Sequence, residues 1–427
     1  MSDMAGRGFE NAGDAVEFIG GFSHSGRPVS DLSRIKELLR AAGDPQDSLR
    51  FIHIAGTNGK GSAAEMFSCV MQRAGLRTGL FTSPFIIDYT DRIRINGRNI
   101  PPEKLALHAG RVRELLRDFP RAGELSQFEV TECIAFLYFQ AEGCDIVVLE
   151  TGLGGLLDCT NAVTTTVLSA IMSVDLDHTA ILGSTVAEIA AQKAGIIKPG
   201  IPAVLSAGND PEAVRVTVQA AERCKSRLMI PDVSRLDVIS CGCIGTEFIY
   251  KGRRFSTSMG GRHQITNALT VIEGCEILGI DESAVAEGIR DASIPGRLTV
   301  LSRQPLTLLD GAHNPDAMRA LAAAIRQEDT GDTGVIIGMC RDKSMAEALR
   351  ELIPEAQEFV TTDGFSDRAE DREALAELIR SLGGRARAGG ELAQEIAAMQ
   401  QRRKTTVICG SLYLVTEVLN NNISGGS

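Results

Sequence analysis

Apolar residues along this chain gather in short runs that alternate with longer amphipathic stretches. The runs are rich in β-branched residues and lack strict polar–apolar alternation, which predicts strands buried on both faces. They are FIHIA (51–55), DIVVLE (145–150), TVLSAIMSV (166–174), LTLLD (306–310), GVIIGM (334–339) and TTVIC (405–409). Helical periodicity fills several gaps between them, as in residues 31–43 and 129–143. Alternating strands and helices predict an α/β fold with mostly parallel sheets.

A Pro-Gly pair at 295 and 296 is the best candidate for a domain boundary, because a new strand pattern starts just after it. The predicted domains are residues 1–295 and 296–427, both of ordinary size. Residues 235–258 have polar turns between short strands, which predicts antiparallel β structure, placed as an appendage on the first sheet. The tail at 420–427 is expected to be disordered.

Charge and cysteine usage narrow the class of protein. The chain has 427 residues and a formal net charge of −11, which disfavours nucleic acid and anionic membranes as partners. Its ten cysteines have no zinc-ligand spacing and fit reduced, buried thiols. No apolar run reaches membrane-spanning length, and the N-terminal residues carry no apolar signal segment. A cytoplasmic protein is therefore expected.

The sharpest motif is AGTNGKGS (55–62), a Gly-rich turn between a buried strand and a helix pattern. Glycines let backbone N–H groups approach phosphate oxygens, and the helix N-terminus favours an anion. Lys60 would lie by the β- and γ-phosphates. Gly61 stands where the strict pattern has Ser or Thr, so Ser62 is the candidate hydroxyl. The predicted nucleotide-binding residues are Thr57, Asn58, Gly59, Lys60, Gly61 and Ser62. A Gly-rich turn with a solvated lysine is the alternative.

Glu150 ends the buried run at 145–150. A carboxylate at the C-terminal end of such a strand is well placed to hold a metal ion near bound phosphates. Asp310 ends a run in the second half, where an acid suits ribose hydroxyls. A strand-end charge that faces water is the alternative for Glu150.

A series of motifs in order resembles the Mur ligase superfamily and, within it, the folylpolyglutamate synthase and dihydrofolate synthase family. The motifs are AGTNGKGS (55–62), Ser83-Pro84, DRIRING (91–97), TGLGGLLDCTN (151–161), SVDLDHTAILG (173–183), HQITNA (263–268), PGR (295–297) and DGAHNP (310–315). The resemblance implies a P-loop ATPase domain followed by a smaller Rossmann-like C-terminal α/β domain. Departures from the family pattern fall at Phe85, Asp91, Leu156 and Asp175. Leu156 stands where the family has an arginine, and the departures concern substrate recognition more than ATP handling.

The resemblance also implies roles for individual residues. The implied catalytic residues are Lys60, Lys193 and His313. The implied magnesium ligands are Ser83, Glu150, His178 and a carbamylated Lys193. Outside the phosphate loop, the implied nucleotide contacts are Asn267 for adenine, Arg297 for phosphates and Asp310 for ribose. The implied substrate contacts are Phe128, Glu129 and Asp158 for the pterin and Ser411 for glutamate.

The implied reaction is an ATP- and Mg²⁺-dependent ligation of L-glutamate to a folate, and also to dihydropteroate, through an acyl phosphate. Closure of two domains about residues 295–297 would keep water from that intermediate. The expected partners are the folate or dihydropteroate, L-glutamate and ATP, with the protein a monomer. Two alternatives stay open. One is a Mur ligase acting on a peptidoglycan precursor, and the other is a non-catalytic nucleotide-binding regulator.

Overall fold

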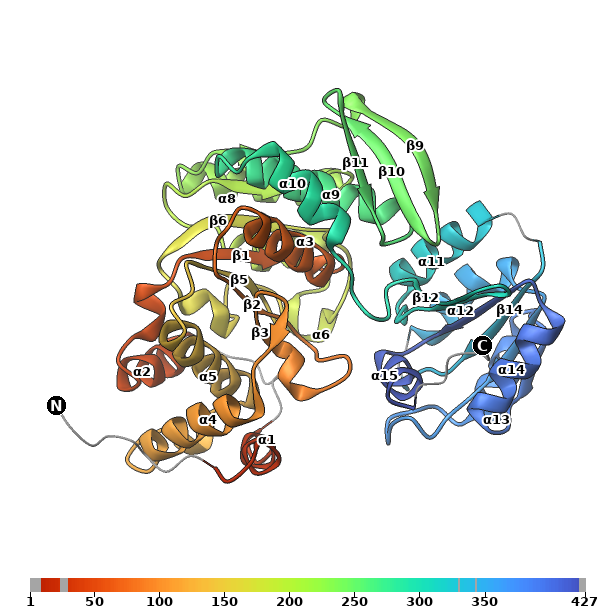
Figure 1. Cartoon of the computed structure of the whole chain (residues 1–427), viewed down its shortest axis with the longest axis horizontal. Coiled ribbons are helices and arrows are strands. Elements are labelled where there is room, and N and C mark those ends of the chain that lie inside the picture. The colour runs from red at the N-terminus through yellow and green to blue at the C-terminus, as the bar shows by residue number, and fades with distance from the viewer. Residues whose placement is uncertain (1–8, 24–29, 329–330, 342–343, 422–427) are drawn as a thin grey trace. The chain divides into compact units, whose positions relative to one another are not determined.

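The computed structural model describes residues 9–23, 30–328, 331–341 and 344–421 (Figure 1). The chain groups into two units, each made of two segments. Unit 1 comprises Met1–Ser234 and Thr266–Asp291, and unit 2 comprises Arg235–Ile265 and Ala292–Ser427. The division predicted at 295/296 stays a prediction about domains, because these units do not follow a single cut of the chain. Asn420, the first residue of the tail expected to be disordered, ends a helix, and residues 422–427 lie outside the described residues.

Unit 1 is built on one sheet with the strand order β4-β3-β2-β5-β1-β6-β7-β8. The strands are β1 (Phe51–Ala55), β2 (Thr78–Phe81), β3 (Ile93–Ile95), β4 (Arg98–Asn99), β5 (Ile146–Glu150), β6 (Thr166–Ile171), β7 (Ala203–Leu205) and β8 (Leu228–Met229). Pairing is parallel from β2 to β8, and β3 and β4 add an antiparallel edge. Every residue of β1 and β5 is buried, which confirms the prediction of strands covered on both faces.

Helices cover both faces of this sheet (Figure 1). They are α1 (Ala12–Gly20), α2 (Ser33–Ala41), α3 (Lys60–Arg73), α4 (Pro102–Leu116), α5 (Gln127–Ala141), α6 (Thr179–Leu182), α7 (Val186–Ala194), α8 (Pro211–Arg223), α9 (Arg262–Ile277) and α10 (Glu282–Asp291). Ser126 begins α5 with a capping box that uses Glu129, and Thr185 begins α7 in the same way with Glu188. These caps satisfy N–H groups that a helix start leaves without partners.

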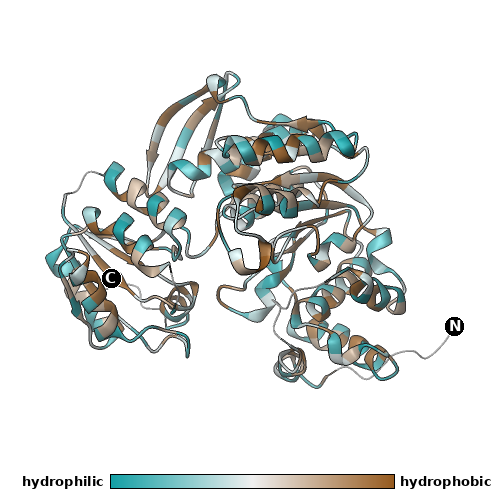
Figure 2. Ribbon diagram, turned by 180° about the vertical axis from the view of Figure 1, so that it is seen from behind, coloured by the Kyte–Doolittle hydropathy of each residue, from teal (hydrophilic) through white to brown (hydrophobic). Residues whose placement is uncertain are grey.

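Unit 2 contains a second, mostly parallel sheet with the order β12-β13-β17-β14-β15-β16. Its strands are β12 (Thr299–Arg303), β13 (Leu306–Leu309), β14 (Thr333–Ile337), β15 (Glu358–Thr361), β16 (Ala386–Ala388) and β17 (Thr405–Cys409). Its helices are α11 (Pro315–Glu328), α12 (Met345–Leu352), α13 (Arg372–Ser381), α14 (Leu392–Arg402) and α15 (Leu412–Asn420). Figure 2 shows apolar residues concentrated on the strands and on the helix faces that cover them. The predicted α/β class is confirmed.

Residues 235–258 form antiparallel β structure, as predicted, but not on the first sheet. Strands β9 (Leu236–Gly242), β10 (Gly245–Tyr250) and β11 (Arg253–Thr257) make a separate sheet in the order β11-β10-β9. The backbone N–H of Cys243, between β9 and β10, donates to Glu328 on α11, and Cys243 packs in the core of unit 2. The expected appendage on the first sheet is therefore wrong, because these strands satisfy their hydrogen bonds among themselves and bury their connection in unit 2.

Short 3₁₀ helices complete the connections: η1 (Pro45–Ser48), η2 (Tyr89–Arg92), η3 (Ala122–Glu124), η4 (Cys159–Ala162), η5 (Val233–Arg235) and η6 (Ile353–Glu355). Within the described ranges, no helix is both long enough and apolar enough to cross a bilayer.

Candidate active site

The predicted phosphate loop joins β1 to α3, and its lysine lies over the loop itself. Lys60 Nζ donates to the carbonyl oxygens of Gly56 at 3.0 Å and Thr57 at 3.1 Å. The N–H of Thr57 donates to Ser173 O at 2.6 Å, and the N–H of Asn58 donates to Ser173 Oγ at 3.1 Å. The loop is therefore held by the segment after β6, in the strand–loop–helix setting that binds phosphate.

Asn267 on α9 reaches the same loop, although it lies about 200 residues further along the chain. A β-carbon on Gly59 would lie 2.4 Å from Asn267 Oδ1, and Gly59 has a φ of +84°. Only glycine adopts this backbone readily and admits the amide so closely. The structure thus places Asn267 beside the predicted nucleotide loop.

Glu150 lies at the C-terminal end of a buried strand, the position at which the sequence predicted an acid that holds a metal ion. It ends β5, it is 4% exposed, and its Oε2 accepts the N–H of Ser83 at 3.1 Å. A β-carbon on Gly61 would lie 3.9 Å from both carboxylate oxygens of Glu150, at the start of α3. Strands β1, β2 and β5 are neighbours in the sheet, so their C-terminal ends bring Lys60, Ser83 and Glu150 to one edge.

These residues fit a magnesium ion that also takes phosphate and water ligands. Mg²⁺ usually binds one or two carboxylates and keeps several waters, so a single acid with a hydroxyl suffices. Across the part of the chain that the structure describes, no group of three or more His, Cys, Asp or Glu side chains forms a metal site. His178 precedes α6 with a side chain 58% exposed, and its Nε2 lies 3.9 Å from Asp177 Oδ1. Its role as a ligand stays a prediction.

Lys193 is a buried lysine on α7 with an unusual charge state. It is 2% exposed, and burial together with the positive charge of Lys60 lowers its pKa to about 7. Opposite charges on Asp177 and Asp158 counter part of that shift. With this pKa about half of the amine is neutral near pH 7. The neutral amine can react with carbon dioxide, and the charge of Lys60 would stabilise the resulting carbamate anion.

The GLGG segment after β5 explains how α7 is held. A β-carbon on Gly155 would lie 2.7 Å from the carbonyl oxygen of Gln192 and 3.0 Å from that of Lys193. The N–H of Leu156 donates to Gln192 O at 2.7 Å. A side chain at Gly155 would push this loop away from α7, so the glycine fixes the distance between the loop and Lys193.

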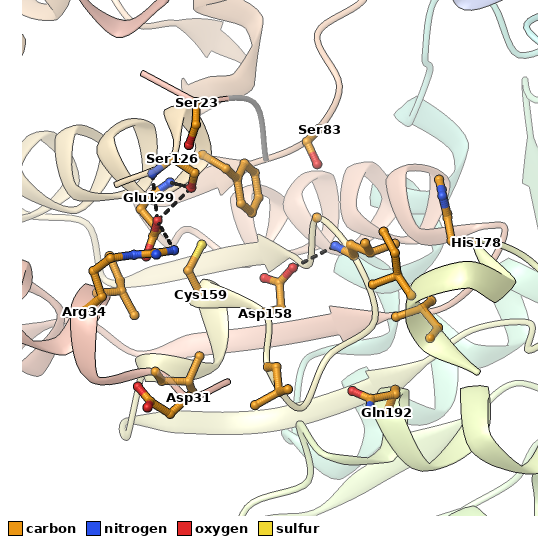
Figure 3. Close-up of a pocket in the computed structure, with 18 of the residues that line it drawn as sticks. Ser23, Asp31, Arg34, Ser83, Ser126, Glu129, Asp158, Cys159, His178 and Gln192 are labelled. Carbon is orange, nitrogen blue, oxygen red and sulfur yellow. Dashed lines mark hydrogen bonds and ion pairs between the residues drawn. The ribbon is translucent and has the colours of Figure 1, made fainter. Parts of the chain in front are cut away.

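A cavity of about 620 Å³ in unit 1 contains many of the predicted substrate and metal residues. Figure 3 shows Arg34, Ser126 and Glu129 at one end, Ser83 and His178 at the other, and Asp158 between them. Phe128 also lines the cavity, 5.5 Å from the ring of Phe81 and close to Gly152, where a β-carbon would lie 2.7 Å from Phe128 Cε1. Phe128, Glu129 and Asp158, predicted as pterin contacts, are thus brought together.

Glu129 is fully engaged by neighbouring groups. Arg34 on α2 donates from Nε to Oε1 and from Nη2 to Oε2, both at 2.8 Å, and Ser126 donates to Oε2 from N and Oγ (Figure 3). The carboxylate therefore braces α2 against the start of α5, and direct substrate contact by Glu129 stays a prediction. Sequence reasoning missed Arg34, because residue 34 lies in a pattern typical of an exposed amphipathic helix.

Three departures from the family pattern, Phe85, Asp91 and Leu156, are next in sequence to residues that line this cavity. Asp91 accepts the N–H groups of Ile86 and Ile87 and so caps the turn after Ser83-Pro84. The guanidinium of Arg92, another lining residue that sequence reasoning missed, lies 5.2 Å from the ring centroid of Phe85. Leu156 is 45% exposed.

In unit 2, Asp310 lies at the C-terminal end of β13. Its oxygens accept the N–H groups of Leu298 and Ala312, both at 2.8 Å. Burial lowers the pKa of the nearby His263, the charge of Asp310 opposes that shift, and Arg297 adds to it. Asp310 and Arg297 are therefore neighbours of one histidine, within unit 2.

Ser411 follows β17, the strand next to β13, and so lies at the same edge as Asp310. Its Oγ accepts the N–H of Tyr413 at 3.1 Å and lies 3.7 Å from Cys340 Sγ. The Nδ1–H of His313 donates to Gly311 O at 2.8 Å, which leaves its Nε2 as the second ring nitrogen. The side chain of His313 is exposed.

Comparison with known proteins gives a consistent result. Residues 296–412 match the family model "Mur ligase, glutamate ligase domain", starting where we predicted the second domain to begin. The dihydrofolate synthase/folylpolyglutamate synthase of Bacillus subtilis is 33% identical over 412 residues, which cover 91% of this chain and 94% of that protein. A probable bifunctional folylpolyglutamate synthase/dihydropteroate synthase of Haloferax volcanii is 35% identical over 402 residues and 90% of this chain. The match spans only 47% of that longer protein.

Two solved structures are similar over nearly the whole chain. The folylpolyglutamate synthase of Thermotoga maritima superposes with a TM-score of 0.85 at 30% identity, covering 96% of this chain and 97% of that one. E. coli FolC in complex with DHPP and ADP gives a TM-score of 0.82 at 26% identity, covering 99% of each chain.

Proposed function

The chain belongs to the folylpolyglutamate synthase and dihydrofolate synthase family, and we propose that it joins L-glutamate to dihydropteroate and to folates in an ATP-dependent ligation. The observation that carries this proposal is the edge of the unit 1 sheet where Lys60, Ser83 and Glu150 meet beside the cavity that contains Asp158 and Phe128. Ser83 both lines this cavity and donates to Glu150, which supports a nucleotide site and a pterin site that adjoin each other.

The reaction requires a carboxylate of the pterin substrate to attack the γ-phosphate of ATP, which forms an acyl phosphate and releases ADP. Lys60 and the N–H groups at the start of α3 would bind and orient the phosphates, which lowers the cost of bringing two anions together. Ser83, Glu150 and, by resemblance, His178 would hold magnesium, whose charge when bound offsets charge on the phosphates. The amine of glutamate then attacks the acyl phosphate, and phosphate leaves.

Lys193 belongs to this proposal as a carbamate. The neutral amine attacks carbon dioxide, one proton is lost to water, and the product is an anion with two oxygens. Its position within the electrostatic reach of Lys60 and its pKa of about 7 support this modification. The anion would contribute oxygen ligands for a second magnesium ion near the acyl phosphate.

Residues of unit 2 enter the proposal by resemblance. Arg297 would contact ATP phosphates, Asp310 the ribose, His313 the reacting groups and Ser411 the incoming glutamate. Support comes from Asp310 and Ser411 ending neighbouring strands at one edge, the usual place for ligand-binding residues in open α/β sheets.

Location and assembly are further parts of the proposal. We expect a monomer in the cytoplasm, where ATP and glutamate are abundant and thiols stay reduced. All ten cysteines lie within the described residues as free thiols, and six of them are buried, which supports a reducing compartment.

The test is ADP release by the purified protein with ATP, Mg²⁺ and L-glutamate, comparing dihydropteroate with tetrahydrofolate as acceptors. We expect release that depends on glutamate and on an acceptor. A UDP-muramyl acceptor serves as the control for a peptidoglycan ligase. ADP release with that acceptor alone, or ATP binding without any glutamate-dependent turnover, would overturn the proposal.

A further inference from the structure

His53 lies in the middle of β1, between the buried apolar residues that precede the phosphate loop. It is 0% exposed, and burial, with a smaller contribution from the charge of Lys198, lowers its pKa to about 3. The imidazole is therefore neutral at physiological pH. Its Nε2 lies 2.9 Å from Oγ1 of Thr160, which is also 0% exposed and belongs to η4.

The direction of these hydrogen bonds follows from Asp158. Oγ1 of Thr160 lies 2.5 Å from Asp158 Oδ1, and Oδ1 and Oδ2 also accept the N–H groups of Thr160 and Leu153. Burial raises the pKa of the Asp158 carboxyl, and the hydrogen bonds from Leu153 and Thr160 counter that shift. In its ionised form this carboxylate can only accept, so the threonine hydroxyl donates to Asp158 and accepts from His53. His53 consequently carries its hydrogen on Nε2.

This tautomer leaves Nδ1 of His53 as a buried acceptor, and within the described residues it has no hydrogen-bond partner. A buried acceptor without a partner lowers stability, so native structures rarely keep one without a reason. An apolar residue at this position of β1 would avoid the cost. The imidazole is therefore better explained by what its Nε2–H does for Thr160 than by packing.

We propose that His53 and Thr160 are positioning residues that fix the orientation of the Asp158 carboxylate toward the substrate ring. The inference rests on the proposed function, because it assumes that Asp158 meets the pterin. Asp158 is 7% exposed and lines the cavity, so its remaining surface faces the space proposed for the substrate (Figure 3). A carboxylate held by Leu153 on one oxygen and Thr160 on the other presents one fixed edge, suited to a flat heteroaromatic ring with adjacent N–H groups.

His53 also connects the phosphate loop with the cavity that contains Asp158. β1 carries His53, and Gly56 of the phosphate loop follows directly after the strand; its carbonyl oxygen accepts a hydrogen bond from Lys60. The neighbouring Glu132 is fully buried, and burial raises its pKa well above the ordinary value. Asp158 is held by the N–H groups of Leu153 and Thr160 and by the hydroxyl of Thr160. His53, on the strand that leads into the phosphate loop, reaches that hydroxyl.

The test measures the affinity of the full chain for dihydropteroate in the absence of nucleotide. The protein is titrated into dihydropteroate, and the fluorescence of the pterin is followed. Thr160→Val keeps the side-chain shape but removes the hydroxyl, and we expect about tenfold weaker binding with unchanged ATP affinity. Thr160→Ser keeps the hydroxyl and should restore binding. His53→Phe should weaken binding as Thr160→Val does, and the double variant should be no worse than either, because both break one chain of hydrogen bonds.

Thr217→Val is the matched control. Thr217 is equally buried, and its Oγ1 donates to Ala213 O at 2.8 Å on α8, away from the cavity, so its loss should leave dihydropteroate affinity unchanged. Equal weakening of dihydropteroate and ATP binding in Thr160→Val would indicate a structural role only and overturn the inference. So would unchanged dihydropteroate affinity.

A measurement on the unaltered protein does not depend on variants. In ¹⁵N-histidine-labelled protein, His53 should show the Nε2–H tautomer with a slowly exchanging proton. An Nδ1–H tautomer would overturn the inference even if dihydropteroate binds. Failure of the unaltered protein to bind dihydropteroate or tetrahydrofolate would instead contradict the proposed function, so the two failures are distinguishable.

Discussion

The phosphate loop and the cavity beside it are built in different ways. The loop is contiguous, residues 55–62, and it offers mainly backbone groups and one lysine for the proposed phosphate binding. The cavity is assembled from side chains of α2, α5, the segment after β5 and α7, such as Arg34, Glu129, Asp158 and Gln192. A site made of backbone depends on its glycines, such as Gly59, and on its charged residue. A site made of paired side chains depends on each pair.

The largest effect is expected at the one charged side chain of the loop. Lys60→Met should lower the rate of ADP release about 10³-fold, because its charge offsets charge that develops on the phosphates. The fold should be unchanged, since Nζ only donates to two loop carbonyls. Lys36→Met, at an exposed position on α2, is the control. Activity within about threefold of the unaltered protein would show that the loop works by backbone alone.

Lys193 is within electrostatic reach of Lys60 in the loop and of Asp158 in the cavity, and its loss should rank next. Lys193→Met should lower turnover about 10²-fold by removing the carbamate oxygens. In buffers with added bicarbonate, the unaltered protein should be more active than in carbon-dioxide-free buffer, and the variant should not respond. Steady-state ADP release with and without bicarbonate checks this, and a similar response in both proteins would contradict the carbamate.

The same lysine predicts a pH dependence of stability. Its folded-state pKa is about 7, whereas the pKa of a lysine in the unfolded chain is about 10.4. Between these values the unfolded chain binds one more proton, so the free energy of unfolding should rise with pH across this window. Below the folded-state pKa, Lys193 is charged in both states, and the full cost of burying that charge lowers the free energy of unfolding. Urea unfolding at about pH 7.5 and about pH 9.5, in carbon-dioxide-free buffer, should show a smaller rise in Lys193→Met.

A smaller effect should follow from breaking a pair at the cavity wall. Arg34→Met leaves the buried Glu129 without its bidentate partner, so the free energy of unfolding should fall by about 2 kcal/mol. The KM for dihydropteroate should rise about tenfold while that for ATP stays constant, because only the cavity is disturbed. Arg34→Met combined with Glu129→Gln should recover part of the stability. Equal changes in the KM values for dihydropteroate and ATP would mean that the cavity and the phosphate loop do not bind their substrates independently.

The smallest effect is expected at Leu156, which is next in sequence to the cavity residue Leu157. Leu156→Arg restores the charge of the family pattern at a position that is 45% exposed. The KM for anionic folate glutamates should fall about threefold, and the gain should shrink in high salt. Leu156→Gln, polar but uncharged, is the control, and an equal gain in that variant would exclude a charge effect.

Much of unit 1 could be predicted because its strands are short, apolar and regularly spaced. The loop at 55–62 could be recognised from the sequence because its glycines, its lysine and the strand before it are consecutive. The position of residues 235–258 in the fold could not be predicted. Antiparallel pairing within a segment does not indicate which hydrophobic core buries the turn between its strands. Cys243 packs with residues of unit 2 that are far away in sequence.

The sequence by itself determined the α/β class, the parallel order of strands and helices, and the nucleotide loop. These depend on local periodicity and on consecutive residues, and the motif order then identified the family. Only the tertiary structure decided that Arg34 braces Glu129, that Asn267 closes on Gly59, and that His53 reaches Asp158 through Thr160. Burial and hydrogen-bond geometry between distant segments set these contacts, and neither is written in any local pattern of residues.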